Sequence, residues 1–212
     1  MIQRIAIYGG TFDPIHFGHL RSIEELRERL SLDCVRLIPS YTPPHRGQPG
    51  ATSKQRLDML HLATDNLSNM IVDDREVRRK GTSYTVDTLA ELRSEYGATV
   101  QIVFVLGSDA FALLHEWHKW QELTNYVHLV VMERPQANAQ ITDGLVLEWL
   151  EARSVKGVEQ LIGPSGQVAR VRLSPIDISA TEIRRRVRTG ESLEDFVPLE
   201  VANYIDEHKL YV

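Results

Sequence analysis

The sequence has a single cysteine, no long apolar run and no excess of basic residues. Cys34 has no partner for an internal disulfide, and its apolar neighbour Val35 favours a reduced, buried thiol. No apolar stretch approaches the roughly 20 residues that a membrane-spanning helix needs. The first apolar residues reach a glycine pair too early for a secretory leader. We therefore expect a cytoplasmic protein with no membrane partner.

The charge balance and the glycine patterns argue against two further classes of protein. The 212 residues include 24 basic and 29 acidic ones, for a formal net charge of −5. Nucleic-acid-binding domains usually carry a basic face, so we expect no nucleic-acid partner. The chain also lacks the G-x-G-x-x-G pattern of dinucleotide-binding dehydrogenases and the G-x-x-x-x-G-K-[ST] phosphate loop. A Rossmann dehydrogenase is therefore disfavoured.

Short apolar runs alternate with segments of helical spacing along the whole chain. Apolar runs without alternation are typical of strands covered on both faces of a parallel sheet. The expected strands are 2–8, 35–38, 71–77, 100–106, 127–132 and 168–173. The expected helices are 20–30, one from about residue 53, 86–96, 145–151 and two closing helices, the last beginning at Pro198.

This alternation predicts the α/β class, with an open, doubly wound parallel sheet. We expect residues 1–212 to form a single domain whose C-terminal part, from about 176 to 212, is helical. Ligands of such folds bind at the carboxyl ends of the strands, near the point where the strand order reverses. Chemistry is therefore expected directly after the apolar runs.

The segment after the first expected strand, Gly9 to His19, reads G-G-T-F-D-P-I-H-F-G-H. Its two leading glycines allow close approach of the backbone to a ligand. His16 and His19 are three residues apart where a helix begins, so their rings are expected on one face. N–H groups at a helix start add partial positive charge. The pattern indicates a donor array for a triphosphate.

A second short pattern, residues 178–184, reads I-S-A-T-E-I-R near the other end of the chain. Ser179 followed three residues later by Glu182 predicts a capping box. Thr181 and Arg184 then fall in the first turns of a helix and face an anion. Such a box alone usually marks only a helix start, and its pairing with the first pattern is what makes it specific.

Together these patterns resemble the H-x-G-H nucleotidyltransferase superfamily. Three further elements occur in the order typical of the bacterial nicotinate mononucleotide adenylyltransferase family within it: Pro43-Pro44-His45-Arg46, Ser83-Tyr84-Thr85, and Gly107-Ser108-Asp109 with Trp117-His118. The resemblance covers essentially the whole chain. It implies a Rossmann-like nucleotidyltransferase fold and transfer of the adenylyl group of ATP to nicotinate mononucleotide. The products are deamido-NAD and pyrophosphate, in NAD biosynthesis.

The resemblance also implies roles for individual residues. His16, His19 and Arg184 are the expected catalytic residues, holding the ATP phosphates as charge moves to the leaving group. The expected ATP-binding residues are Gly9, Gly10, Thr11, His16, His19, Gly107, Asp109, Ser179, Thr181 and Arg184. The expected residues for nicotinate mononucleotide are Asp13, His45, Arg46, Tyr84, Thr85, Trp117 and Arg134.

Among the acceptor residues, Trp117 is the expected stacking partner of the nicotinate ring, whereas Trp120 is expected to pack in the core. Tyr84 and Thr85 are expected to offer helix-start N–H groups to the nicotinate carboxylate. Some relatives have an aromatic residue where this chain has Ile176, which bears on the affinity for the acceptor.

Mg²⁺ is the expected cofactor, bound with ATP through phosphate oxygens and water, since no pair of acidic residues has the spacing of a dedicated protein metal site. The alternatives are a phosphopantetheine adenylyltransferase, a cytidylyltransferase, or a noncatalytic nucleotide-binding module. The length of the middle section argues against the first two. The presence of both phosphate-binding patterns argues against the third. The sequence leaves a homo-oligomer open.

Overall fold

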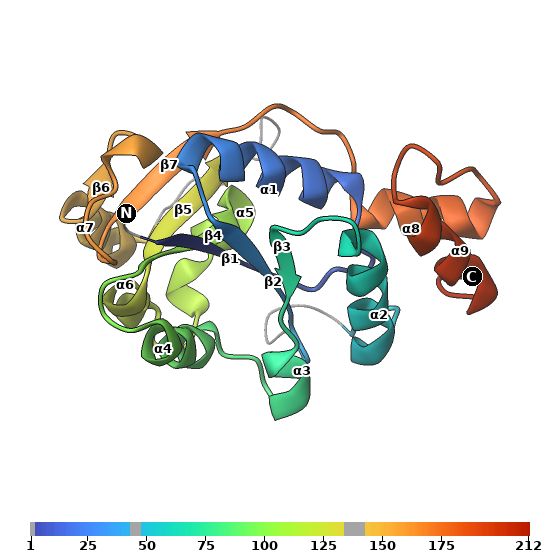
Figure 1. Ribbon diagram of the computed structural model, residues 1–212, viewed down its shortest axis with the longest axis horizontal. Helices are drawn as coiled ribbons and strands as arrows, with labels where there is room; N and C mark the ends of the chain where they lie inside the picture. Colours follow the sequence, from blue (N-terminus) through green and yellow to red (C-terminus); the bar gives the residue numbers. More distant parts are fainter. Residues whose placement is uncertain (1–2, 43–47, 134–142) are drawn as a thin grey trace. The chain divides into compact units, whose positions relative to one another are not determined.

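The computed structural model describes residues 3–42, 48–133 and 143–212, in which strands and helices alternate (Figure 1). The strands are β1 (Arg4–Gly10), β2 (Cys34–Pro39), β3 (Met70–Val72), β4 (Gln101–Gly107), β5 (His128–Glu133), β6 (Ser154–Val155) and β7 (Val168–Arg172). The α-helices are α1 (Phe17–Leu30), α2 (Ser53–Thr64), α3 (Arg75–Arg79), α4 (Thr85–Tyr96), α5 (Ser108–Ala112), α6 (Leu123–Tyr126), α7 (Gly144–Glu151), α8 (Ala180–Thr189) and α9 (Leu199–Glu207). Three 3-10 helices are η1 (Leu114–Glu116), η2 (Trp120–Glu122) and η3 (Val158–Gln160).

The described strands form one sheet in the order β3-β2-β1-β4-β5-β7-β6. Strand β4 pairs in parallel with both β1 and β5, and β7 pairs in parallel with both β5 and β6. The strand order reverses between β1 and β4, as in a doubly wound sheet. The predicted fold class is therefore confirmed.

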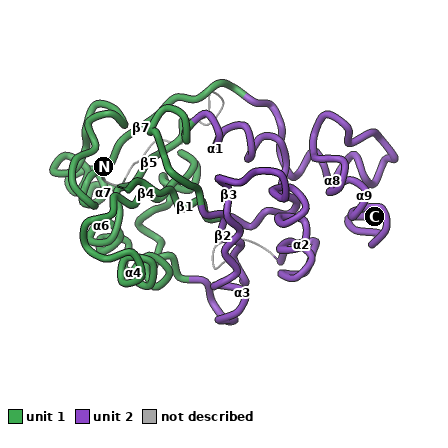
Figure 2. The backbone as a smooth tube through the Cα atoms, viewed as in Figure 1, with its two compact units in different colours: residues 1–9, 26–35, 84–175 green, residues 10–25, 36–83, 176–212 purple. Residues whose placement is uncertain are grey.

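The chain divides into two compact units, each built from separate stretches of sequence (Figure 2). Unit 1 comprises residues 1–9, 26–35 and 84–175, and unit 2 comprises residues 10–25, 36–83 and 176–212. The C-terminal helical part that the sequence predicts, with α8 and α9, lies within unit 2. The assignment of the whole chain to a single domain stays a prediction.

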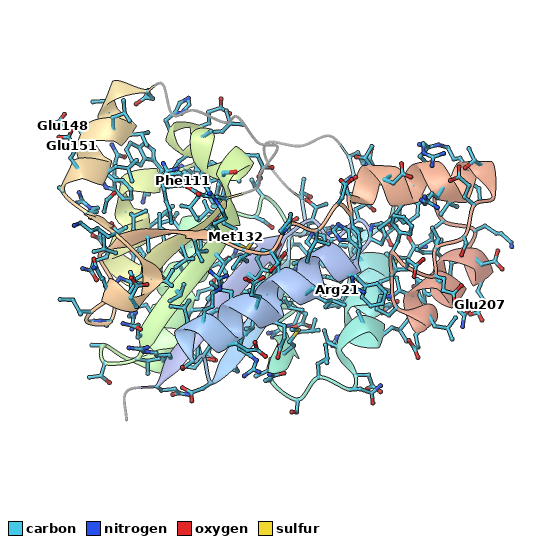
Figure 3. The ribbon with its side chains drawn as sticks, turned by 90° about the horizontal axis from the view of Figure 1, so that it is seen from above. Arg21, Phe111, Met132, Glu148, Glu151 and Glu207 are labelled. Carbon is cyan, nitrogen blue, oxygen red and sulfur yellow. The ribbon has the colours of Figure 1, made fainter. Side chains whose placement is uncertain are left out.

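The core of unit 1 lies along β4 and β5. All residues of β4 except its last are buried, and so are the first five of β5. Phe111 of α5 and Met132 of β5 are 1% and 4% exposed and belong to this core (Figure 3). Burial on both faces explains why these strands are continuous apolar runs in the sequence.

Arg93 of α4 donates hydrogen bonds to several main-chain carbonyls in unit 1. Its guanidinium donates to the oxygens of Tyr126 (Nε, 2.8 Å, and Nη2, 2.6 Å), Gly97 and Val100 (Nη1, 2.8 Å each) and Pro164 (Nη2, 2.8 Å). These carbonyls belong to segments that precede β4, β5 and β7. Burial lowers the pKa of Arg93. The residue therefore fastens the amino-terminal approaches of three strands.

His128, the first residue of β5, is fully buried in the same region. Its Nδ1 accepts from the Gln167 N–H at 3.1 Å, so the ring proton is on Nε2, which lies 3.1 Å from the Gly163 oxygen. Burial lowers the pKa of His128. The hydrogen bond to Gly163 opposes this effect, and the positive charges of Arg93 and Arg4 add to it. The neutral ring is thus the form that fits the fold.

One predicted strand is wrong in its second half. The sequence predicts a strand at 71–77, but β3 ends at Val72 and α3 begins at Arg75. Asp73 causes the change of direction, because its Oδ1 accepts from the Arg75 N–H at 3.1 Å. Its Oδ2 also pairs with Arg36 at 2.9 Å. Polar contacts of Asp73 therefore end the strand, and the pattern of apolar residues does not predict them.

The other predicted elements are found within a few residues of their expected bounds. Pro198 lies just before α9 and is its N-cap residue. Cys34 is partly exposed, so the prediction of a buried thiol is wrong. No helix in the described part of the chain is long and apolar enough to cross a lipid bilayer.

Candidate active site

In the turn after β1, the ring of Phe12 packs back against Gly10, the last residue of the strand. Phe12 has a positive φ of 51° and is only 2% exposed. A β-carbon at Gly10 would lie 2.9 Å from Phe12 Cζ, so the ring packs where a side chain would otherwise be. Gly10 is therefore needed for packing within the turn, beside the ligand contact that the sequence predicts.

The two histidines of the first pattern lie against each other. The rings of His16 and His19 stack with centroids 3.7 Å apart and planes at 27°. Phe12 meets His19 edge-on at 5.3 Å. His16 is 5% exposed and directly precedes α1. The prediction that both rings share one face is confirmed.

The amide groups at the start of α1 are less available than the sequence predicts. The Phe17 N–H donates to the Phe196 oxygen at 2.9 Å. The amides of His19 and Leu20 donate to the His16 oxygen at 2.9 and 3.2 Å. Among these first residues, only the Gly18 N–H has no hydrogen bond to the described part of the chain. Most N–H groups at this helix start are therefore already bonded within the protein.

Gly18 is where the two sequence patterns touch. A β-carbon at this position would lie 2.8 Å from His16 Nδ1 and 3.1 Å from the Ile178 oxygen. The contact with Ile178 brings the I-S-A-T-E-I-R segment directly against the H-x-G-H turn. A larger residue at 18 would have to displace the His16 ring or the backbone before α8.

The start of α8 is capped as predicted, with one difference. Ser179 is the N-cap residue, and its hydroxyl accepts from the Glu182 N–H at 3.2 Å. The Glu182 carboxylate does not return to Ser179 and instead binds Arg185 and Arg186 at 2.8–2.9 Å. These hydrogen bonds, first with Arg185 and then with Arg186, lower the pKa of Glu182. The reciprocal half of the capping box is therefore wrong.

Arg184 joins the two patterns by a hydrogen bond. Its Nη1 donates to the main-chain oxygen of Asp13 at 2.6 Å, across 171 positions of sequence. Its Nη2 donates to the Thr181 hydroxyl at 3.3 Å. The side chain is 28% exposed, so the guanidinium is held by protein on one side and reaches solvent on the other. The expected meeting of the two patterns is thus found within unit 2.

Asp13 lies at the centre of this meeting. Its carboxylate accepts from the Gly50 and Ala51 N–H groups at 2.8 and 3.0 Å and from the Tyr211 hydroxyl at 2.9 Å. It also lies 3.7 Å from Arg184 Nη1. Asp13 is 8% exposed. Its carboxylate oxygens are therefore engaged by protein donors, and its predicted contact with the acceptor substrate stays a prediction.

Arg56 of α2 is a member of this cluster that sequence reasoning missed. It is 1% exposed, and its guanidinium donates to the oxygens of Thr11, Ser40 and Tyr41 at 2.6, 2.7 and 3.1 Å. Burial lowers its pKa, which the negative charge of Asp13 opposes. The residue fixes the segments that follow β1 and β2. In the sequence it looks like any polar residue of an amphipathic helix.

Three of the predicted acceptor residues, Tyr84, Thr85 and Trp117, lie in unit 1, at the start of α4 and in the region after α5. Tyr84 is the N-cap residue of α4, and Thr85 is its first residue. The ring centroids of Tyr84 and His118 are 4.5 Å apart. Thr85 thus has the helix-start position that the sequence predicts. The contact between Tyr84 and His118 adds an aromatic pair that spacing alone did not indicate.

The two neighbouring tryptophans differ as expected. Trp120 is 7% exposed and meets Trp149 edge-on at 5.3 Å, which confirms its place in the core. Trp117 is partly exposed and meets Phe104 of β4 edge-on at 6.2 Å. Trp117 thus packs against the sheet without being fully buried.

The remaining predicted residues have simpler positions. Gly9 lies next to the Phe104 ring, with 3.4 Å between a β-carbon at Gly9 and Cε2 of the ring. Gly107 is the N-cap residue of α5, and Asp109 is exposed on that helix. His45, Arg46 and Arg134 lie outside the described residues.

The donor set of the cluster in unit 2 suits anionic oxygens. Its members include the imidazoles of His16 and His19, the Thr181 hydroxyl and the partly exposed Arg184 guanidinium. No group of three or more His, Cys, Asp or Glu side chains suited to a metal ion occurs in the residues that the structure describes.

Comparisons with known proteins agree with this geometry. A family model described as cytidylyltransferase-like matches residues 7–186. A protein of Pseudomonas fluorescens described as a probable nicotinate-nucleotide adenylyltransferase is 44% identical over 211 residues, covering 100% of this chain and 98% of that protein. A protein of Pseudomonas aeruginosa with the same description is 43% identical, with the same coverage.

A solved structure has the same fold. The Plasmodium falciparum nicotinic acid mononucleotide adenylyltransferase complexed with NaAD matches with a TM-score of 0.74 and 18% sequence identity. The match covers 99% of this chain and 97% of that one. At this identity the likeness concerns the fold alone.

Proposed function

Because this chain belongs to the cytidylyltransferase-like family, we propose that it transfers the adenylyl group of ATP to nicotinate mononucleotide. The products are deamido-NAD and pyrophosphate, and the reaction is a step of NAD biosynthesis. The curated relatives of 42–44% identity over nearly their whole length support the choice of this activity within the family.

The observation that carries the proposal is the contact between the two sequence patterns in unit 2. The stacked imidazoles of His16 and His19 lie in one pattern, and the Arg184 guanidinium of the other pattern is bound to the Asp13 carbonyl. Imidazole, hydroxyl and guanidinium donors in one place are suited to a chain of phosphates. A noncatalytic module would not need donors from both ends of the chain.

The chemistry requires positioning more than proton transfer. An oxygen of the nicotinate mononucleotide phosphate attacks the α-phosphorus of ATP and forms a new P–O bond. The bond from the α-phosphorus to the oxygen bridging to the β-phosphate breaks, and pyrophosphate leaves with the electron pair. The nucleophile is already an anion at neutral pH. Catalysis is therefore alignment of two polyanions and stabilisation of charge on the leaving group.

Each donor has a role in this scheme. His16 and His19 bind the ATP phosphates and stabilise the negative charge that develops on the leaving oxygen. Thr181 and Arg184 bind the β- and γ-phosphates. Ser179 caps α8 and so fixes both of those residues. The backbone of Gly9, Gly10 and Thr11 forms the floor beneath the reacting groups.

We assign the acceptor and the nucleoside to the other residues that the resemblance implies. Trp117 stacks on the nicotinate ring, which is worth about 1 kcal/mol beyond the area buried. Tyr84 and Thr85 meet its carboxylate at the start of α4, where a helix favours negative charge. Gly107 and Asp109 contact the adenosine part of ATP. His45, Arg46 and Arg134 complete the set as phosphate or acceptor contacts.

We also propose that ATP enters as its Mg²⁺ complex. The ion supplies neutralisation of the phosphate oxygens when it is bound. The donors available in unit 2 fit this arrangement, because the Asp13 carboxylate is engaged by Gly50, Ala51 and Tyr211. A cytoplasmic location, as expected from the sequence, stays a prediction.

The activity is tested by pyrophosphate release from the purified chain. Mg-ATP is offered with nicotinate mononucleotide, nicotinamide mononucleotide or phosphopantetheine in separate reactions, and Mg-CTP replaces Mg-ATP in a fourth. We expect turnover with ATP and nicotinate mononucleotide, and less with the amide. Turnover only with phosphopantetheine, or only with CTP, would overturn the assignment.

The role of the imidazole pair is tested by His19→Ala. Loss of one preorganised donor is expected to lower kcat roughly 100- to 1000-fold. His61→Ala, which alters an exposed histidine of α2, is the matched control and should keep wild-type kcat. A folded His19→Ala variant with wild-type turnover would refute the role given to His19.

A further inference from the structure

Tyr211 reaches the candidate site from the far end of the chain. Its hydroxyl donates to Asp13 Oδ1 at 2.9 Å, across 198 positions of sequence. Both residues are buried, at 9% and 8% exposure. Burial raises the pKa of Tyr211, and the negative charge of Asp13 raises it further, so the hydroxyl stays a proton donor at neutral pH.

The tyrosine ring and the carboxylate hold the same turn. Asp13 binds the N–H groups of Gly50 and Ala51, and a β-carbon at Gly50 would lie 3.0 Å from Tyr211 Cδ1. The ring therefore packs directly against the turn whose amides the carboxylate accepts. The hydroxyl adds the one hydrogen bond that ties this packing to Asp13.

The same Asp13 also sets the direction of Arg184. The guanidinium donates to the Asp13 carbonyl at 2.6 Å and lies 3.7 Å from its carboxylate. Rotation of the carboxylate would change the field at Arg184 and free the amides of Gly50 and Ala51. Three hydrogen bonds and the nearby Arg184 guanidinium leave the carboxylate little freedom for such rotation, and Tyr211 donates one of the three.

We propose that Tyr211 is a positioning residue for the transfer reaction: its hydroxyl fixes the Asp13 carboxylate and so keeps Arg184 aimed at the departing phosphates. Tyr211 itself touches no substrate. This inference rests on the function proposed above, and it adds a residue that lies outside both sequence patterns.

The test uses Tyr211→Phe, which keeps the ring against Gly50 and removes only the hydroxyl. Loss of a hydrogen bond to a charged group is expected to lower kcat roughly 10-fold or more. KM for ATP should rise less than kcat falls, because Arg184 acts most strongly as charge moves to pyrophosphate. The measurement is steady-state pyrophosphate release at varied ATP.

Tyr204→Phe is the matched control. The Tyr204 hydroxyl also donates to a carboxylate, at 3.0 Å to Asp58 Oδ2, but this hydrogen bond joins α9 to α2 and does not involve Asp13. Its variant should keep wild-type kcat. Equal losses in the two variants would overturn the proposal, because they would indicate a general effect of loosening the C-terminal segment.

A double-mutant cycle separates positioning from simple support. In an Arg184→Lys background, Tyr211→Phe should cost less than about 2-fold in kcat, since the group through which it acts is already altered. Full additivity of the two losses would overturn the proposal.

A readout without turnover keeps this inference distinct from the proposed function. Amide hydrogen exchange of the full chain should show Gly50 and Ala51 exchanging roughly 10-fold faster in Tyr211→Phe than in the wild type. Unchanged exchange at both amides would overturn the role of Tyr211. A wild-type chain that is inactive with ATP and nicotinate mononucleotide would instead overturn the proposed function.

Discussion

Each unit of the molecule has one arginine that gathers main-chain carbonyls, and the two arginines act at different places. Arg56 in unit 2 binds the oxygens of Thr11, Ser40 and Tyr41, which follow β1 and β2. Arg93 in unit 1 binds the oxygens of residues that precede β4, β5 and β7. Burial lowers the pKa of both.

The difference lies in what each arginine holds. Segments that follow parallel strands carry the ligand contacts of a doubly wound fold, whereas segments that precede strands serve stability. Arg56 also lies beside the charge of Asp13, and Arg93 has no such neighbour among the causes that shift its pKa. The comparison predicts that Arg56 supports both folding and activity, and that Arg93 supports folding alone.

The largest effect is expected for Arg56→Met. Three carbonyls lose their donor and Asp13 loses a compensating charge, so the free energy of unfolding should fall by about 3–5 kcal/mol. Without this anchor the backbone at Thr11 should shift by about 1 Å, and a shift of that size should also lower kcat/KM for ATP roughly 100-fold. Urea unfolding and pyrophosphate release measure the two effects.

Arg56→Lys and Arg78→Met are the controls for that variant. Lysine keeps the charge but lacks the planar fork, so only part of the stability should return. Arg78 forms an exposed pair with Asp74, with 70% and 40% of the side chains exposed, and its loss should change stability by less than about 1 kcal/mol. Wild-type kcat/KM in Arg56→Met would remove the contrast between the two arginines.

A smaller and purely structural effect is expected for Arg93→Met. Removal of the donor to three partly buried carbonyls and one exposed carbonyl should lower the free energy of unfolding by about 2–3 kcal/mol. The kcat of the folded variant should stay within about 2-fold of wild type, because Arg93 holds only segments before strands. A loss of kcat comparable to that of Arg56→Met, measured under conditions where the variant is folded, would contradict the comparison.

The smallest effect concerns pH and His128, which binds the same region as Arg93. Its pKa is lowered below the ordinary 6.5 when the chain is folded, so the unfolded chain binds more protons as pH falls. Stability from the neutral ring is therefore fully present above about pH 6.5 and is lost progressively below it, down to the folded pKa. The expected loss between pH 7.5 and 5.5 is about 1 kcal/mol.

Denaturant unfolding at the two pH values checks this loss. A His128→Gln variant should show a smaller difference between them, whereas His61→Gln, altered at an exposed histidine, should keep the wild-type difference. Identical pH dependence in the wild type and His128→Gln would show that another group is responsible.

Elements with a strong local pattern could be predicted from the sequence. The apolar runs of β4 and β5 and the helix α4, which ends at Tyr96, are found almost at their expected bounds. The end of β3 could not be predicted, because Asp73 acts through a turn to Arg75 and an ion pair with Arg36, 37 positions away. Apolar periodicity carries no information about such polar contacts.

In the candidate site too, residues with a local sequence pattern could be predicted, and residues that act over long sequence distances could not. His16, His19 and Arg184 could be proposed because their residue types and local spacing suit a triphosphate. Arg56 and Tyr211 could not, because each acts on main-chain or carboxylate groups far away in sequence. The hydrogen bond from the Phe17 N–H to the Phe196 oxygen could not be predicted either. No residue near Phe17 indicates that a carbonyl 179 positions later in the sequence will bind there.

The order of synthesis has a consequence for unit 2, whose three stretches of sequence are 10–25, 36–83 and 176–212. A nascent chain that ends before Ile176 already contains both histidines but lacks Arg184 and Tyr211. Closing such distant contacts is slow compared with local folding, and it can begin only when the last stretch has left the ribosome. Unit 2 is thus completed last, when the stretch 176–212 joins the two earlier ones.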